Sequence, residues 1–271
     1  MTAAYGPRRS ELYAERVSSP QLSTIRTGTA DDTSITLLHG FTQTAGCWGT
    51  FADILATSHP IVAVDLPGHG GSADVRANLP QTAELLAATL EPSIVIGYSL
   101  GGRVALHLAL AHPELVKRLI VIGATGGLEG NEERAQRRTA DDALADHLED
   151  IGIEAFLDEW LSQPLFASLT AEQSCRQVRA TNSATGLASS LRLCGTGTQE
   201  PLWDRLGELT MPVLVIAGAN DDKFTQLGHQ LVESIGTNAS IQIIDNAGHS
   251  AQLENPTASA STITKWLSET L

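Results

Sequence analysis

A serine flanked by two glycines is the first residue whose setting favours chemistry. It is Ser99, in the sequence Gly97-Tyr98-Ser99-Leu100-Gly101. An apolar run precedes this G-x-S-x-G pattern, and a helix-forming stretch follows it. A sharp turn from strand to helix exposes a serine hydroxyl at the carboxyl end of a sheet, beside a helix N-terminus that favours negative charge. An ordinary glycine-rich turn can have the same G-x-S-x-G pattern. The apolar run before it and the helix-forming stretch after it favour a reactive serine over such a turn.

A reactive serine requires a base and an acid that orients the base. Asp221 and Asp222 follow one later apolar run, and His249 follows the next. If these runs are neighbouring strands, both loops lie at the sheet edge that carries Ser99. We therefore predict His249 as the base and either Asp221 or Asp222 as the orienting acid.

An oxyanion hole is expected next to the serine. The segment His39-Gly40-Phe41 follows an apolar run that ends at Leu38. The main-chain N–H of Phe41 is one expected donor, and the N–H of Leu100, directly after the serine, is the second. A tight turn without a catalytic role is the alternative interpretation of this segment.

The composition of the chain argues against some classes of binding partner. The chain has 271 residues, of which 42% are hydrophobic, and a formal net charge of −14. Such a surface repels nucleic acid and anionic membranes, and no apolar segment approaches the ~20 residues of a membrane span. Arg8 and Arg9 precede polar residues rather than an apolar run, so no signal peptide is expected. Three cysteines without metal-type spacing are typical of a reduced, cytoplasmic protein, and we predict neither a metal nor a cofactor.

Apolar runs alternate with helical stretches along most of the chain, which predicts a mostly parallel sheet covered by helices on both faces. The expected strands are 36–38, 61–64, 93–96, 119–122, 213–217 and 241–244, with a more extended first strand between Tyr13 and Arg26. Residues 126–203 interrupt the alternation with the pattern of several consecutive helices. We expect one α/β domain over residues 1–271, with residues 126–203 inserted as a helical cap.

Several segments together carry a family resemblance. They are Asp65 to Ser72, Gly97 to Arg103, the arginine-rich Glu133 to Arg138, Trp160 to Leu169 (W-x-x-Q-P-x-F-x-S-L), Arg179 to Asn182, Gly218 to Phe224 (G-x-x-D-x-K-F) and Gly248 to Pro256. Over roughly residues 35–270 the chain resembles the 2-succinyl-6-hydroxy-2,4-cyclohexadiene-1-carboxylate (SHCHC) synthases of menaquinone biosynthesis. The first two segments are widespread among related enzymes, whereas the cap segments are more specific. The resemblance implies an α/β-hydrolase fold with the helical cap inserted after the sixth strand.

The reaction of this family is an elimination rather than a hydrolysis. Its substrate, 2-succinyl-5-enolpyruvyl-6-hydroxy-3-cyclohexene-1-carboxylate, loses a ring proton and pyruvate to give SHCHC. The resemblance implies that Ser99 is the base, activated by His249 and without an acyl intermediate. Its D-x-K-F segment implies Asp221, rather than Asp222, as the acid.

An anionic substrate accounts for arginines in the site, because planar guanidinium groups pair with carboxylates. The resemblance implies substrate-anchoring roles for Arg103, Arg137 and Arg179, and pocket-lining roles for Tyr98 and Trp160. Arg134 and Arg138 lie within a turn of Arg137, and all three could instead form a solvated helix face.

Two other functions compete with this one. A serine hydrolase would use the same residues on a small ester or C–C bond through an acyl-enzyme. A ligand sensor would keep the fold with little turnover, and the complete set of Ser, His and Asp argues against it. The expected partner is a small anionic substrate, and the expected assembly is a monomer or a small homo-oligomer.

Overall fold

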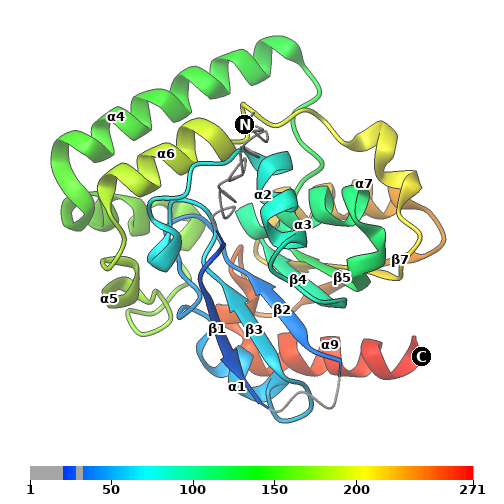
Figure 1. Ribbon diagram of the computed structural model, residues 1–271. Helices are drawn as coiled ribbons and strands as arrows, with labels where there is room; N and C mark the ends of the chain where they lie inside the picture. The colour runs from blue at the N-terminus through cyan, green and yellow to red at the C-terminus, as the bar shows by residue number, and fades with distance from the viewer. Residues whose placement is uncertain (1–20, 29–32, 271) are drawn as a thin grey trace, which may run out of the picture.

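The computed structural model describes residues 21–28 and 33–270, and seven strands in this part of the chain form one sheet (Figure 1). The strands are β1 (Thr24–Thr27), β2 (Ile35–Leu38), β3 (Ile61–Val64), β4 (Ser93–Tyr98), β5 (Val116–Ile122), β6 (Val213–Gly218) and β7 (Ala239–Ile244). Their order is β1-β3-β2-β4-β5-β6-β7, and only the β1–β3 pair of this sheet is antiparallel. The prediction of a mostly parallel sheet is confirmed. The expected first strand is represented by β1, and residues 13–20 lie outside the described residues.

Helices connect the strands. They are α1 (Gly49–Leu55), α2 (Leu79–Ala87), α3 (Leu100–Ala111), α4 (Asn131–Leu161), α5 (Arg176–Arg179), α6 (Ala184–Cys194), α7 (Asp222–Ile235), α8 (Ala251–Glu254) and α9 (Pro256–Glu269). Short 3₁₀ turns are η1 (Gly70–Ser72), η2 (Pro113–Leu115), η3 (Pro164–Phe166) and η4 (Trp203–Glu208). None of the helices in the described part of the chain is long and apolar enough to cross a membrane.

Alternate residues of each central strand enter two different cores. In β4, Ile94 and Ile96 pack with α1 and α9, whereas Val95 packs on the opposite face with α2 and α3. The same alternation holds in β5 and β6, because successive side chains of a strand point to opposite faces. The continuous hydrophobicity of these strands therefore reflects burial on both sides.

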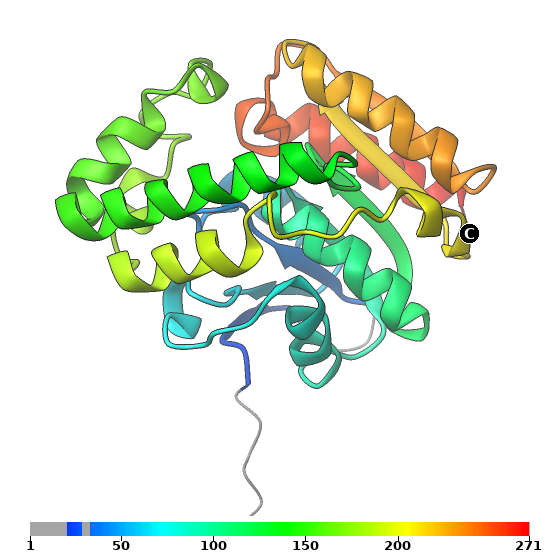
Figure 2. The ribbon, with the colours of Figure 1, turned by 90° about the horizontal axis from the view of Figure 1, so that it is seen from above.

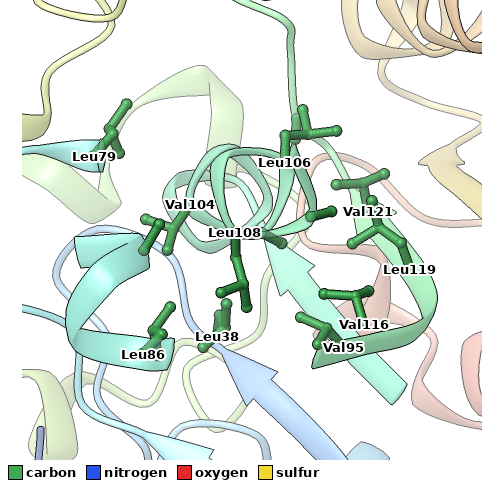
Figure 3. Close-up of a cluster of buried hydrophobic side chains, with 14 of the residues drawn as sticks. Leu38, Leu79, Leu86, Val95, Val104, Leu106, Leu108, Val116, Leu119 and Val121 are labelled. Atoms are coloured by element: carbon green, nitrogen blue, oxygen red, sulfur yellow. The ribbon is translucent and has the colours of Figure 1, made fainter. Parts of the chain in front are cut away.

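Helix α3, which follows Ser99, is held firmly in the larger of these cores. Figure 3 shows its valine and leucine side chains between α2 and the sheet. Val104, Leu106 and Leu108 are at most 1% exposed. Burying a side chain of this size contributes about 1.5–3 kcal/mol, so the helix is a rigid support for the serine at its N-terminus.

The segment between β5 and β6, residues 123–212, is here called the helical insertion. Its helices α4 and α6 lie side by side, at a distance from the strands of the sheet (Figures 1 and 2). They share a small core of their own, which includes Leu148, Phe156 and Leu187. Helix α4 covers both helices expected between residues 131 and 161, and it bends between them at Gly152, whose φ of 78° suits glycine. In the described residues the insertion follows the fifth strand, whereas the family resemblance implies the sixth.

Candidate active site

The turn that carries Ser99 is strained and closely packed. Ser99 has φ 51° and ψ −107°, which a residue with a side chain rarely adopts, and it directly precedes α3. A Cβ at Gly97 would collide with the main chain of Gly101, and one at Gly101 would collide with the Leu38 carbonyl. Both flanking glycines are therefore required for β4, α3 and β2 to approach one another, and this approach lifts the Ser99 hydroxyl above the sheet.

His249 lies between Ser99 and Asp221. Its Nε2 is 3.3 Å from Ser99 Oγ, and its Nδ1 is 3.0 Å from Asp221 Oδ2. Because a carboxylate only accepts hydrogen bonds, Nδ1 carries the proton and Nε2 is left to accept the serine proton. Asp222, by contrast, is an exposed residue that begins α7.

Asp221 is held as a carboxylate. Burial alone would raise its pKa, but hydrogen bonds from His249 and from the Phe224 N–H keep the pKa below its ordinary value. The Phe224 bond also caps α7, so the helix fixes the position of the carboxylate.

These residues open onto a cavity of about 220 Å³ between the sheet edge and the helical insertion. The cavity is lined by the site residues expected from the sequence with the exception of Asp221, namely Phe41, Tyr98, Ser99, Leu100, Arg103, Arg137, Trp160, Arg179 and His249. Asp221 instead contacts Nδ1 of His249, whereas the Nε2 of that ring faces Ser99. The structure thus brings the expected residues together from both the sheet and the insertion.

The loop with Phe41 is fixed by His39. The Nδ1 of His39 lies 2.9 Å from the Gly40 oxygen, and its Nε2 accepts the Leu66 N–H at 3.1 Å. The second bond makes Nδ1–H the donor to Gly40. Because the C=O and N–H of one trans peptide point in opposite directions, the Phe41 N–H faces away from His39. This arrangement suits a hydrogen-bond donor at the cavity wall.

Tyr98 forms the floor beside this loop. Its hydroxyl is 2.6 Å from Ser250 Oγ, and burial raises its pKa above the ordinary value, so the phenol stays neutral. A Cβ at Gly40 would collide with the Tyr98 ring. Tyr98 and Gly40 therefore depend on each other for space.

Arg103 reaches the cavity from α3, one turn after Ser99. It is 8% exposed, and burial lowers its pKa to about 10, so it remains charged at neutral pH. Its Nη1 donates to Gln199 Oε1 at 3.2 Å. Arg137 enters from α4 and donates from Nε to Asp141 at 2.8 Å.

Arg179 of α5 is 1% exposed and is held mainly by oxygens of the main chain. Its Nε donates to the Ser174 oxygen at 2.7 Å, and Nη1 donates to the Phe41 oxygen and to Thr42 Oγ1. Its Nη2 is buried without a hydrogen-bond partner among the described residues. A buried guanidinium with an unused N–H favours an anionic ligand.

Arg137 is the cap-helix arginine at the cavity. Arg134 turns instead to the main-chain oxygens of Leu128 and Glu129, and Arg138 is exposed and does not line the cavity. The sequence left this choice open because three arginines within two turns differ only in the direction that the helix gives them.

Trp160 lines the cavity and packs against other aromatic rings. Its ring lies 5.2 Å from Phe41 and 5.8 Å from Phe156 between centroids. Its indole N–H is buried and finds no partner in the described part of the chain.

Other residues at the site were not expected from the sequence. Lys223 and Phe224 line the cavity, and the D-x-K-F motif could have indicated both. Glu254 accepts hydrogen bonds from the N–H groups of Gly248 and Ser250, on either side of His249, at 2.5 and 2.9 Å. Nothing in the spacing of Glu254 predicts this support. Within residues 21–28 and 33–270, no group of three or more His, Cys, Asp or Glu residues is placed to hold a metal ion.

The fold and the site geometry are those of an α/β hydrolase, and the profile of the alpha/beta hydrolase family matches residues 37–262. A putative SHCHC synthase from Bacillus subtilis is 36% identical over 238 residues, which cover 82% of this chain and 86% of that protein. The SHCHC synthase of Salmonella typhimurium is 33% identical over 82% of this chain and 89% of its own length. The structure of MenH from S. aureus superimposes with a TM-score of 0.83 at 29% identity, over 93% of this chain and 99% of that one. The chain belongs to the SHCHC synthase family of α/β hydrolases.

Proposed function

We propose that this protein is a lyase that eliminates pyruvate from 2-succinyl-5-enolpyruvyl-6-hydroxy-3-cyclohexene-1-carboxylate to form SHCHC in menaquinone biosynthesis. One observation carries the proposal: a Ser99–His249 pair and three arginines from three different helices line the same cavity. A general esterase has no need for three fixed cations around its serine.

The substrate's structure matches this arrangement. Its name specifies three carboxylates, on the succinyl group, on the enolpyruvyl group and on ring carbon 1. Arg103, Arg137 and Arg179 would each pair with a carboxylate, since guanidinium forms directed, charge-assisted bonds with such groups. The chain as a whole carries a net charge of −14, so the three arginines make the cavity a local positive exception that attracts an anion.

The proposed reaction is a 1,4-elimination that begins at ring carbon 2. The succinyl ketone is attached there, so loss of the C2 proton places negative charge on the ketone oxygen. Ser99 takes this proton while His249 Nε2 accepts the serine proton, and the Asp221 carboxylate stabilises the resulting imidazolium. The N–H groups of Phe41 and Leu100 would stabilise the enolate oxygen.

The remaining electrons complete the elimination. The enolate collapses to a C2=C3 bond, the C3=C4 bond shifts to C4=C5, and the C5–O bond breaks. The leaving enolpyruvate takes back one proton and becomes pyruvate. No covalent bond to Ser99 forms, and no cofactor is required by this balance.

We further propose that residues 126–203 act as a cap of a single α/β domain in the cytoplasm. The support is that Arg137, Trp160 and Arg179, all from the insertion, line the same cavity as Ser99. Water would be displaced from the cavity when the anion binds, which strengthens each ionic contact.

The test is to supply the enolpyruvyl substrate and follow pyruvate release. We expect one pyruvate per diene product, and Ser99→Ala or His249→Ala should lower the rate by about 10²–10⁴-fold. Ser162→Ala and His229→Ala change exposed residues and serve as controls. No release above the buffer rate by the wild-type protein would overturn the proposal.

Mass spectrometry separates the lyase from a hydrolase. A serine hydrolase treated with an activated ester accumulates an acyl group on the serine. The lyase assignment predicts unmodified Ser99 throughout turnover of the enolpyruvyl substrate. An acyl adduct on Ser99 during that turnover would contradict the proposed mechanism.

A further inference from the structure

Two buried polar side chains accept hydrogen bonds from arginines of the cavity. They are Asp141 of α4 and Gln199 of the segment that leads from α6 to η4, and each is 2% exposed. Neither lines the cavity itself. Burying a carboxylate or an amide is costly unless its hydrogen bonds are made, so the bonds that each one forms indicate its role.

Asp141 holds Arg137. Its Oδ1 accepts from Arg137 Nε at 2.8 Å, and its Oδ2 accepts from the Gly197 N–H at 3.4 Å. The Arg137 side chain is 46% exposed, whereas that of Asp141 is 3% exposed. A half-exposed arginine would sample many rotamers, and the buried carboxylate restricts them. Because only Nε of Arg137 forms a hydrogen bond among the described residues, both terminal nitrogens are left for a ligand.

Gln199 holds Arg103. Its Oε1 accepts from Arg103 Nη1 at 3.2 Å. No carboxylate within the described residues forms an ion pair with Arg103, so the neutral amide fixes the guanidinium without cancelling its charge. In the described part of the chain, Nε and Nη2 of Arg103 form no hydrogen bond and are available to a carboxylate.

One short segment joins the two supports. A Cβ at Gly195 would collide with the Asp141 carboxylate, and one at Gly197 would collide with the main chain of α4 at Arg138. The segment therefore lies directly against α4, and its residues Gly195 and Thr196 also line the cavity. The contact of residues 195–199 with α4 thus sets the positions of both guanidinium groups at once.

We propose that Asp141 and Gln199 are positioning residues that hold Arg137 and Arg103 in a fixed geometry for an anionic substrate. This inference rests on the proposed function, since it requires those arginines to bind the carboxylates. Neither residue touches the substrate. Their effect comes from preorganisation, because a cation that is already held loses little entropy when the anion arrives.

The experiment measures substrate binding in a Ser99→Ala background, where chemistry is blocked and Kd is read directly by calorimetry. Asp141→Asn and Gln199→Met keep the side-chain size and remove, respectively, the charge and the acceptor. We expect each to raise Kd about 10-fold, which is the scale of one charge-assisted hydrogen bond. Asp142→Asn and Gln136→Met, on exposed positions of α4, are the matched controls and should leave Kd unchanged.

Double-mutant cycles distinguish positioning from a general structural role. If Asp141 acts through Arg137, Asp141→Asn should have no further effect on Kd once Arg137 is replaced by methionine. The same holds for Gln199→Met after Arg103→Met. Independent, additive losses, or an unchanged Kd for folded Asp141→Asn and Gln199→Met, would overturn the proposal.

Folding is checked by circular dichroism and melting temperature. If Asp141→Asn does not fold, Asp141→Glu, which retains the charge, takes its place. The double-mutant cycle of Gln199 and Arg103 then tests the positioning role as well. A Ser99→Ala protein that does not bind the substrate at all contradicts the proposed function. Substrate binding with unaltered affinity in both positioning variants contradicts only the present inference.

Discussion

Arg179 of α5 donates a hydrogen bond from Nη1 to the main-chain oxygen of Phe41, at 3.3 Å. This bond joins the helical insertion to the loop after β2. Nη2 of the same guanidinium is buried and has no hydrogen-bond partner among the described residues. Under the proposed function, Arg179 would connect the anchoring of the substrate with the placement of the expected oxyanion donor.

Arg179→Met should impair both binding and chemistry. We expect kcat/KM to fall about 100-fold or more, because an anchor and the order of the Phe41 loop are lost together. The melting temperature should fall by about 5 °C or more, as several buried hydrogen bonds disappear. Steady-state pyruvate release and thermal unfolding measure the two effects. Arg192→Met removes an arginine that pairs with Asp146 and Glu149 and does not line the cavity, so it is the control for kcat/KM. A wild-type kcat/KM for Arg179→Met would refute the assignment.

The neighbouring acids Asp221 and Asp222 provide a matched pair. Asp221→Asn should lower kcat by about 10²–10⁴-fold, because an amide no longer stabilises the protonated His249. Asparagine still caps α7 well, so the free energy of unfolding should change little. Asp222→Asn should retain wild-type kcat. A larger loss of kcat in Asp222→Asn than in Asp221→Asn would reverse the choice of acid.

Glu254 supports the loop that carries His249 and also accepts from Ser168 of the insertion at 2.6 Å. Glu254→Gln replaces one acceptor oxygen by an NH₂ group that faces N–H donors. We expect kcat to fall between about 10- and 100-fold through misplacement of the imidazole. KM should change less, since Glu254 does not line the cavity. The control is Glu269→Gln, at an exposed position at the end of α9, and an equal change in kcat for both variants would contradict this role.

Buried histidines predict a loss of stability in mild acid. Burial lowers the pKa of His39 to about 4 and that of His69 to about 3. Their ordinary pKa is about 6.5 in the unfolded chain, so the unfolded state binds more protons below that pH. The stability contributed by the neutral histidines is complete above pH 6.5 and declines as the pH falls toward 4.

Urea unfolding at pH 7, 6 and 5 measures this dependence. His69→Gln should flatten the decline below pH 6.5 by about 1.4 kcal/mol per pH unit, the value for one titrating group. His229→Gln, on the exposed side of α7, should leave the slope unchanged. Equal slopes for wild type and His69→Gln would show that His69 is protonated alike in both states.

The strands and most connecting helices could be predicted from the sequence, because apolar runs and turn residues are local signals. The boundaries were less accurate. Strand β5 begins at Val116. The sequence predicts a start three residues later, because Lys117 and Arg118 interrupt the apolar run. Within α4, the non-helical conformation of Gly152 (φ 78°, ψ 169°) separates two helical parts, and this agrees with the two helices that the sequence indicates. Tertiary packing of α4 on α6 supports this long, bent element.

Within the site, the elbow around Ser99 could be predicted from local residues, since two glycines next to a strand and a helix leave few other conformations. The sequence also placed His249 and an acid at the same sheet edge. The packed fold was needed to show which of Arg134, Arg137 and Arg138 faces the cavity, and which oxygens hold Arg179. It alone revealed Asp141, Gln199 and Glu254 as supports. A side chain's direction and its buried partners depend on segments that are distant in the sequence, and local patterns do not specify those contacts.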